Sequence, residues 1–278
     1  MLGTLIIVFR EVLEAGLIVG ITMAATRGVA RRGLWIAVGV LAGAFGAGLA
    51  ALCMRALSSM FEGVGQELFN AAILLTAVVM LAWHNIWMAS HGRELATEMR
   101  GVGHAVSAGT TTLAGLALVV GVAVLREGTE AALFLYGVVI TAEENSGLAL
   151  VAGGLAGLVL GGVVAAVTYF GLLTIPPRLF FSVTSALLAL LAAGMAAQAI
   201  AFLEQANVVT ALGQTLWDSS GVLSDTSLVG KALHTLVGYS DHPSAMQVVI
   251  YGATLIAIAA LTRLFAGQPR VRNAERTA

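Results

Sequence analysis

The chain has 278 residues, of which 59% are hydrophobic and only 10% are charged, and its net charge is −1. Its mean hydropathy of +0.94 excludes an ordinary soluble domain. No basic stripe with interleaved aromatic residues is present, which argues against a nucleic-acid partner. The composition predicts a protein that crosses the lipid bilayer several times.

Seven apolar stretches are long enough to cross a hydrocarbon core of about 30 Å as helices. Long runs such as LLTAVVMLAW do not alternate apolar with polar residues, so a transmembrane β-barrel is excluded. We therefore predict an all-α membrane protein with seven transmembrane helices, whose first helix is a retained span because charges break its apolar centre. The predicted spans are residues 2–26, 34–57, 68–89, 110–140, 147–173, 179–203 and 246–266.

The first stretch, IIVFREVLEAGLIVG, carries Arg10, Glu11 and Glu14 in its middle. A charged residue at the centre of a spanning helix costs roughly 3 kcal/mol on insertion scales, so three facing lipid would cost about 9 kcal/mol. On a helix Glu14 lies three residues from Glu11 and four from Arg10, so the three side chains gather on neighbouring faces of one turn. We expect them to face the protein interior and to have a function.

The fourth stretch repeats this pattern in LREGTEAALFLYG, with Arg126, Glu127 and Glu130 at the same spacing. The two copies share R-E-x-x-E-A-x-L. The helix that follows each copy has small residues at four-residue spacing, which allow close helix packing in lipid. These are Gly39 and Gly43 after the first copy, and Gly153, Gly157 and Gly161 after the second.

Two units of three spans each must cross the membrane in opposite senses, because three is an odd number. The sequence therefore predicts an inverted repeat, an architecture of transporters whose substrate site lies near the bilayer midplane between the units. The expected parts are a first repeat at 1–89, a cytoplasmic linker at 90–109, a second repeat at 110–204, an extracytoplasmic loop at 205–245, and a seventh helix with a basic cytoplasmic tail at 246–278.

If the two motif helices face each other, four glutamates and two arginines converge in one buried volume with a formal charge of −2. We expect one or more glutamates to hold a proton when the site is empty, and a cation to relieve the repulsion. Carboxylate oxygens select hard ions such as Mg²⁺, Ca²⁺, Mn²⁺ or iron, and no histidine or cysteine lies beside either motif in the sequence. Charge counting leaves the oxidation state of the ion open.

The motifs have two other possible interpretations. Each Arg–Glu pair could be a buried ion pair that only holds helices together, but each motif has one carboxylate more than its arginine neutralises. A di-iron oxidase centre would need Glu-x-x-His motifs, and no glutamate here is followed three residues later by histidine. We therefore expect no enzyme and no catalytic residue.

The basic residues predict the orientation through the positive-inside bias. If the N-terminus lies outside and the C-terminus inside, the outer loops contain only Arg55 and Lys231 as basic residues. The inner loops and tail then contain Arg27, Arg31, Arg32, Arg93, Arg100, Arg178, Arg263, Arg270, Arg272 and Arg276.

Other polar residues are weaker candidates. Glu143 and Glu144, which follow the second motif helix, form a candidate entrance path, together with an acidic vestibule of Asp218, Asp225 and Asp241 that would concentrate cations. Solvated loop charge is the ordinary alternative. For His84 and Asn85, near the inner end of the third span, a packing or interfacial role is favoured over that of an exit-path ligand.

Two intramembrane R-E-x-x-E motifs in seven spans, followed by LWDSSGVLSDTSLVGKALHTLVGY before the last span, resemble the high-affinity iron permease family over nearly the whole chain. The resemblance implies iron uptake across the cytoplasmic membrane, with iron as a transported substrate rather than a permanent cofactor. It implies Glu11, Glu14, Glu127 and Glu130 as metal ligands, with Arg10 and Arg126 as their electrostatic partners.

The same resemblance implies partners outside this chain: an extracytoplasmic oxidase that converts Fe²⁺ to Fe³⁺, or periplasmic iron-binding proteins. Two alternatives stay open at this point. One is a permease for another cation such as Mn²⁺ or Pb²⁺, and the other is a membrane subunit of an oxidoreductase complex that transports nothing. The sequence gives no oligomeric state.

Overall fold

The computed structural model describes residues 1–59, 65–140, 147–171, 177–225 and 227–266. They form eight α-helices, and β-structure within these ranges is limited to an isolated bridge between Thr215 and Ser244. The prediction of an all-α protein is confirmed. The helices are α1 (Leu2–Ala25), α2 (Arg32–Ser59), α3 (Gln66–Ser107), α4 (Leu113–Ile140), α5 (Gly147–Tyr169), α6 (Pro177–Gln205), α7 (Leu228–Val237) and α8 (Ala245–Ala266).

Five of these helices are long and apolar enough to cross a membrane. The candidate spans are Arg32–Met54, Gln66–Met88, Gly147–Tyr169, Ser182–Gln205 and Ala245–Phe265. Helices α1 and α4 have 24 and 28 residues and similar apolar sequences, but each carries three charged residues in its middle. A membrane protein is therefore supported, whereas the total of seven spans stays a prediction.

The outer faces of the apolar helices carry large exposed hydrophobic side chains. Phe45 on α2 and Ile256 on α8 are each 71% exposed, and Leu41 on α2 is 69% exposed. Soluble proteins rarely expose apolar patches of this extent, because contact between apolar surface and water is unfavourable. Contact of these faces with lipid chains removes that cost.

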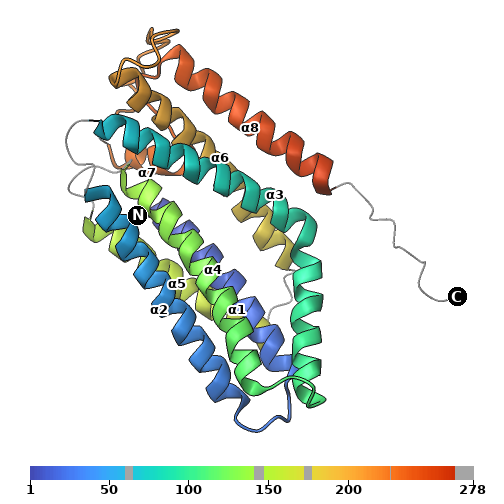
Figure 1. Ribbon diagram of the computed structural model, residues 1–278. Helices are drawn as coiled ribbons and strands as arrows, with labels where there is room; N and C mark the ends of the chain where they lie inside the picture. Colours follow the sequence, from blue (N-terminus) through green and yellow to red (C-terminus); the bar gives the residue numbers. More distant parts are fainter. Residues whose placement is uncertain (60–64, 141–146, 172–176, 226, 267–278) are drawn as a thin grey trace, which may run out of the picture.

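The helices form two groups, which Figure 1 shows side by side. In the first group, α2 packs on α4, α1 packs on α5, and α1 contacts α4. In the second group, α6 contacts both α3 and α8. Because α3 also contacts α1 and α4, the two groups meet at the helices that carry the charged motifs.

Glycines allow each motif helix to approach a neighbour closely. A Cβ atom added to Gly43 on α2 would lie 2.5 Å from the carbonyl oxygen of Gly121 on α4. A Cβ atom added to Gly157 on α5 would lie 2.6 Å from the carbonyl oxygen of Leu5 on α1. Each motif helix therefore packs on the glycine-bearing helix that belongs to the other half of the sequence.

A large apolar core holds α1, α3, α4 and α6 together. It joins Ile7 of α1, Leu74 of α3, Phe134 of α4 and Leu188 of α6, each no more than 1% exposed. Burial of a Leu, Ile or Phe side chain stabilises the folded state by roughly 1.5–3 kcal/mol. The polar motif residues therefore lie beside a buried apolar core.

Helix α3 differs from the prediction, since residues 90–107, expected as part of a cytoplasmic linker, continue α3 to Ser107. No proline interrupts residues 66–107, so the backbone can stay helical beyond the apolar stretch. Figure 1 shows the C-terminal part of α3 running in a different direction from its first part. There the Ser107 hydroxyl donates to the carbonyl oxygen of Ala25, at 3.1 Å.

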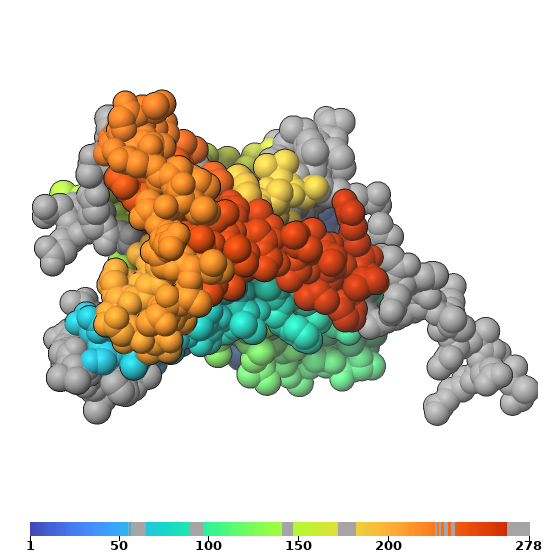
Figure 2. Space-filling model, turned by 90° about the horizontal axis from the view of Figure 1, so that it is seen from above, coloured from blue at the N-terminus to red at the C-terminus, as the bar shows by residue number. Residues whose placement is uncertain are grey.

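Helix α7 was not predicted within the loop at 205–245. Its N-cap is Ser227, whose hydroxyl oxygen accepts a hydrogen bond from the Gly230 backbone N–H at 2.9 Å. It ends at Gly238, which adopts a left-handed conformation with φ of 71°. Figure 2 shows the segment between α6 and α8, in orange, gathered at one end of α8.

Candidate metal centre

The motif residues come together where α1 and α4 face the middle of α3. On α1, the Arg10 Nε–H donates to Glu14 Oε1 at 2.8 Å. The side chains of Arg10 and Glu14 are only 1% and 2% exposed. A charge-assisted hydrogen bond of this kind limits the cost of burying both charges.

The second motif is arranged more openly. On α4, the Nε atom of Arg126 lies 3.2 Å from Glu127 Oε1 and 3.3 Å from Glu130 Oε1. Its guanidinium carbon is 4.8 Å from the centre of the Trp87 ring, in a cation–π contact. The Arg126 side chain is 39% exposed, so the two motifs have the same residues but differ in their access to the surroundings.

A histidine from α3 joins the two motifs. His84 Nε2 lies 3.3 Å from Glu14 Oε2, and its Nδ1 forms an ion-pair contact with Glu130 Oε2. The His84 side chain is 4% exposed. Next to it, the side-chain amide of Asn85 donates to the carbonyl oxygen of Ser185 on α6 at 3.0 Å, which helps to hold this turn of α3 in place.

Four side chains can offer ligand atoms to one ion. Atoms of Glu11, His84, Glu127 and Glu130 all lie within 4.8 Å of one another. Opposite ligands of an octahedral site with bonds of about 2.1 Å lie about 4.2 Å apart, so small side-chain shifts would close the group around an ion. Oxygen ligands with one imidazole nitrogen suit a transition metal ion.

Several carboxylate oxygens of this group are poorly satisfied. Both oxygens of Glu11 and Oε2 of Glu127 are buried without a hydrogen-bond partner among the described residues. Buried polar groups normally have partners, since leaving one unpaired costs about 1–3 kcal/mol and more when it is charged. A bound cation would satisfy these oxygens, whereas simple helix-to-helix ion pairing would not leave them unpaired.

The predicted site residues fall into three sets. Glu11, Glu127 and Glu130 come together within the four-residue group, and Arg10 and Arg126 lie against motif glutamates as expected. Glu14 is not in the group, because Arg10 holds one of its oxygens and His84 faces the other. The proposed entrance residues at positions 143 and 144 lie outside the described residues.

The sequence favours a packing or interfacial role for His84, and the structure places it between the two motifs. No histidine lies beside either motif in the sequence, and the fold supplies one from α3. The available signal was its chemistry, because an ionisable residue inside an apolar span is a functional candidate by default. Its neighbouring tryptophans favoured the interfacial interpretation instead.

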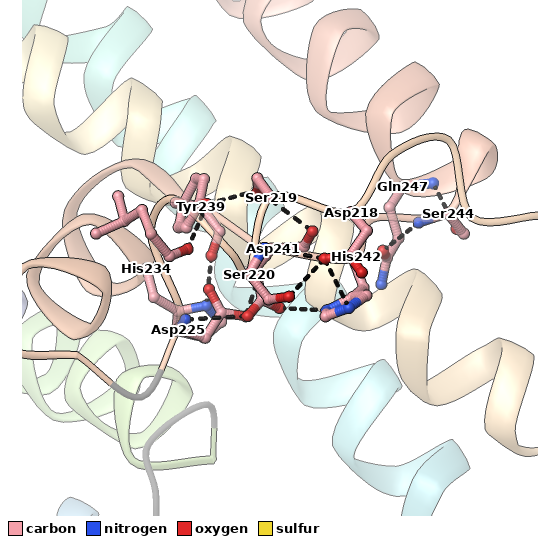
Figure 3. A network of polar contacts seen from close by, with 11 residues as sticks. Asp218, Ser219, Ser220, Asp225, His234, Tyr239, Asp241, His242, Ser244 and Gln247 are labelled. Carbon is pink, nitrogen blue, oxygen red and sulfur yellow. Dashed lines mark hydrogen bonds and ion pairs between the residues drawn. The ribbon is translucent and has the colours of Figure 1, made fainter.

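The acidic residues of the outer segment form a separate network, shown in Figure 3. Asp218 accepts hydrogen bonds from the backbone and side chain of Ser220, at 2.9 and 2.6 Å, and these hold the pKa of Asp218 below its usual value. His242 Nε2 lies 3.1 Å from Asp218 Oδ1, and its Nδ1 lies 2.7 Å from Asp241 Oδ1. The hydrogen bond between His242 and Asp241 lowers the pKa of Asp241 and raises the pKa of His242.

Asp225 and Asp241 tie this network to the start of α7. Each carboxylate accepts a hydrogen bond from the backbone N–H of the other residue, at 3.1 and 3.2 Å. Burial raises the pKa of Asp225. Asp225 and Asp241, two of the three carboxylates expected to form a cation vestibule, thus accept hydrogen bonds from each other's backbone. These hydrogen bonds stabilise the fold of the loop.

An all-helical protein with apolar outer faces and an acidic cluster among its central helices has the features of a membrane transport protein for cations. The sequence model of the Iron permease FTR1 family matches residues 1–272. The chain belongs to this family of permeases.

Curated relatives agree with this family. The chain is 32% identical to the "Ferrous iron permease EfeU" of Escherichia coli O6:H1 over 261 residues, which cover 90% of this chain and 91% of the relative. It is 30% identical to the protein of the same name from Yersinia pestis over 255 residues, which cover 90% and 89%. No solved structure matches the chain.

Proposed function

We propose that this protein moves iron into the cytoplasm through the group of ligands between α1, α3 and α4. The observation that carries the proposal is that Glu11, His84, Glu127 and Glu130 offer ligand atoms within 4.8 Å of one another in a buried place. Glu14 lies beside this group, where one of its oxygens faces Nε2 of His84. The four glutamates and two arginines leave a formal charge of −2, which one divalent ion neutralises.

The architecture that suits this function is a seven-span inverted repeat, with α1–α3 and α4–α6 as the two units and α8 as the added span. The reciprocal packing of α1 on α5 and of α4 on α2 supports it, because a two-fold relation between units would produce this exchange. The distribution of arginines supports an N-terminus outside and a C-terminus inside the cytoplasmic membrane.

Transport then requires that the cluster open to one side at a time. The units can rock against each other around the fixed site, as inverted repeats do. Arg10 and Arg126 limit the repulsion between glutamates when no ion is bound. A membrane potential favours entry by about 2.3 kcal/mol per charge per 100 mV, and exchange with protons on the glutamates is a second source of driving force.

The ion that arrives at the site is iron in one of two forms. The names of the relatives specify ferrous iron. The family resemblance predicts Fe³⁺ made from Fe²⁺ by a partner oxidase, or delivery by periplasmic iron-binding proteins. Uptake of labelled Fe²⁺ under strictly reducing conditions, compared with uptake after an oxidase is added, distinguishes the two.

The central test measures uptake of labelled iron by purified protein in lipid vesicles. Glu130→Gln should abolish uptake, because it removes one anionic ligand while keeping nearly the same shape. Glu67→Gln is the matched control, since Glu67 is exposed at the start of α3. Normal uptake by Glu130→Gln would contradict the proposed site.

The same vesicles separate the two alternative functions. Mn²⁺ or Pb²⁺ that competes with labelled iron and is itself taken up faster would indicate a permease for that ion. A non-transporting subunit of an oxidoreductase complex would give no uptake with any of these ions and no metal bound at the motifs.

A further inference from the structure

His84 occupies a position that the motif pattern does not account for. It comes from α3, and each of its two ring nitrogens faces a carboxylate of a different motif: Nε2 faces Glu14, and Nδ1 faces Glu130. At 4% exposure, its ring is closed off from the surroundings. A buried imidazole in this position either bridges two acids or binds an ion together with them.

The neighbours of the two nitrogens differ. Glu14 on the Nε2 side is fixed by Arg10, whose Nε–H donates to its other oxygen at 2.8 Å. On the Nδ1 side lies Glu130, which belongs with Glu11, Glu127 and His84 to the group that can share an ion. Contacts from Arg10 to Glu14 and from Glu14 to His84 therefore connect a fixed guanidinium with the candidate metal position.

This arrangement matches how proteins hold a metal-binding histidine. Such a histidine usually donates its second ring N–H to a carboxylate, which sets the tautomer and the ring orientation. Glu14 is placed for this task, because it faces Nε2 while Arg10 keeps its carboxylate in position. Glu14 then lies outside the four-residue group because its task is to orient His84.

We propose that His84 binds the transported ion through Nδ1, that Glu14 is the positioning residue that orients its ring, and that this nitrogen makes the site select Fe²⁺ over Mg²⁺ and Ca²⁺. The inference rests on the proposed function of the cluster as the iron site. Imidazole suits iron and similar transition metal ions, whereas Mg²⁺ and Ca²⁺ bind almost entirely through oxygen. An all-carboxylate site would discriminate poorly against these abundant ions.

The first test needs no variant. The intact protein is loaded with Mn²⁺, and pulsed EPR measures the magnetic coupling of the ion to directly bound nitrogen. The proposal predicts one strongly coupled imidazole nitrogen. Bound Mn²⁺ without such coupling would overturn it.

The second test compares His84→Gln with His104→Gln, a matched control on the same helix whose histidine is exposed and outside the cluster. In vesicles, His84→Gln should lose the nitrogen coupling, and a large excess of Mg²⁺ should now inhibit its iron uptake. His104→Gln should behave as the unaltered protein does. Retained discrimination against Mg²⁺ in a folded His84→Gln protein would contradict the inference.

The third test concerns Glu14. Glu14→Gln keeps a carbonyl oxygen that can accept from the Nε2–H of His84 but loses the negative charge of the carboxylate. Iron affinity should therefore fall by about 10–100-fold, as for other residues that orient metal ligands. Glu127→Gln should lose binding altogether, and an equal loss in both variants would make Glu14 a direct ligand.

If Glu130→Gln abolishes uptake while His84→Gln retains selectivity, only the histidine inference fails, whereas normal uptake by Glu130→Gln removes the proposed function itself.

Discussion

The protein contains two places where a histidine lies between two carboxylates, and they differ in what surrounds them. His84 lies between Glu14 and Glu130 in the cluster, where the three side chains are 4%, 2% and 15% exposed. His242 lies between Asp218 and Asp241 in the outer segment, where His242 is 50%, Asp218 62% and Asp241 13% exposed. Similar chemical groups therefore occur once away from water and once in contact with it.

The difference teaches how to distinguish a structural polar network from a candidate ion site. In the outer segment, serine, histidine and backbone N–H groups contact one oxygen of Asp218, one of Asp225 and both of Asp241, and the other oxygen of Asp225 is buried without a partner among the described residues. In the cluster, both oxygens of Glu11 lack such partners within the described parts of the chain. Burial without partners is unfavourable, and a protein retains it where a ligand supplies the missing contacts.

The sharpest way to break this comparison is to neutralise one carboxylate in each region. Glu127→Gln should abolish iron uptake and leave the melting temperature unchanged or raised, because it removes a buried charge with an unpaired oxygen. Asp241→Asn should lower the stability of the outer segment and leave uptake within about twofold, since its role is the hydrogen-bonded network. Vesicle uptake and thermal unfolding measure both.

The comparison becomes finer between the two arginines. Arg10→Gln leaves Glu14 buried without its ion-pair partner, which should cost about 3–5 kcal/mol of stability. Arg126→Gln should cost clearly less, because the Arg126 side chain is 39% exposed and water can replace it. Denaturant titrations measure the free energy of unfolding of both variants. Equal decreases would show that the difference in burial between Arg10 and Arg126 has no energetic consequence.

Close helix packing should matter for the helices that hold the cluster. A Cβ on Gly157 would meet the carbonyl oxygen of Leu5 at 2.6 Å and the backbone nitrogen of Phe9 at 2.9 Å, so Gly157→Ala should cost about 1–3 kcal/mol. Gly162→Ala on the same helix meets nothing within 4 Å and is the control. Thermal unfolding of both variants tests this, and similar melting temperatures would contradict the observed approach of α1 to α5.

The smallest expected effect is the pH response of the outer segment. The pKa of His242 is raised, so its protonated form stabilises the folded segment at pH values below the ordinary histidine pKa of about 6.5. This stability is lost as the pH rises through the raised value, because the ion pairs with Asp218 and Asp241 disappear. Hydrogen–deuterium exchange at residues 218–242 should accelerate over that range.

The control for this prediction is His242→Gln, which should remove the pH response of the segment while iron uptake stays within about twofold. A loss of uptake as large as that expected for the cluster variants would instead make the outer network part of the transport path.

The sequence predicts most of the helices because the apolar stretches are long and the charged motifs repeat. The predicted span 34–57 corresponds to α2 at Arg32–Ser59, and 246–266 to α8 at Ala245–Ala266. It does not predict that α3 continues to Ser107, because hydropathy marks where apolar residues end and says nothing about where a helix ends. Helix α7 was not predicted because its ten residues are too few to cross a bilayer, although their apolar positions recur at helical spacing between Ser227 and Gly238.

For the candidate site, the motifs predict which residues carry charge but not how they divide their contacts. The approach of Glu11, Glu127 and Glu130 follows from two motif helices that face each other. The contribution of His84 and the burial difference between Arg10 and Arg126 depend on how α3 lies against α1 and α4, a tertiary arrangement that periodicity within one helix does not contain. The motifs therefore indicate which acids come together, and only the fold shows that His84 lies between them.

The most direct measurement is the location of iron in the loaded protein by anomalous X-ray scattering at the iron absorption edge. The account predicts one iron peak within bonding distance of Glu11, His84, Glu127 and Glu130. An iron-loaded structure with no peak there, or with its peak at Asp218, Asp241 and His242 instead, would contradict it.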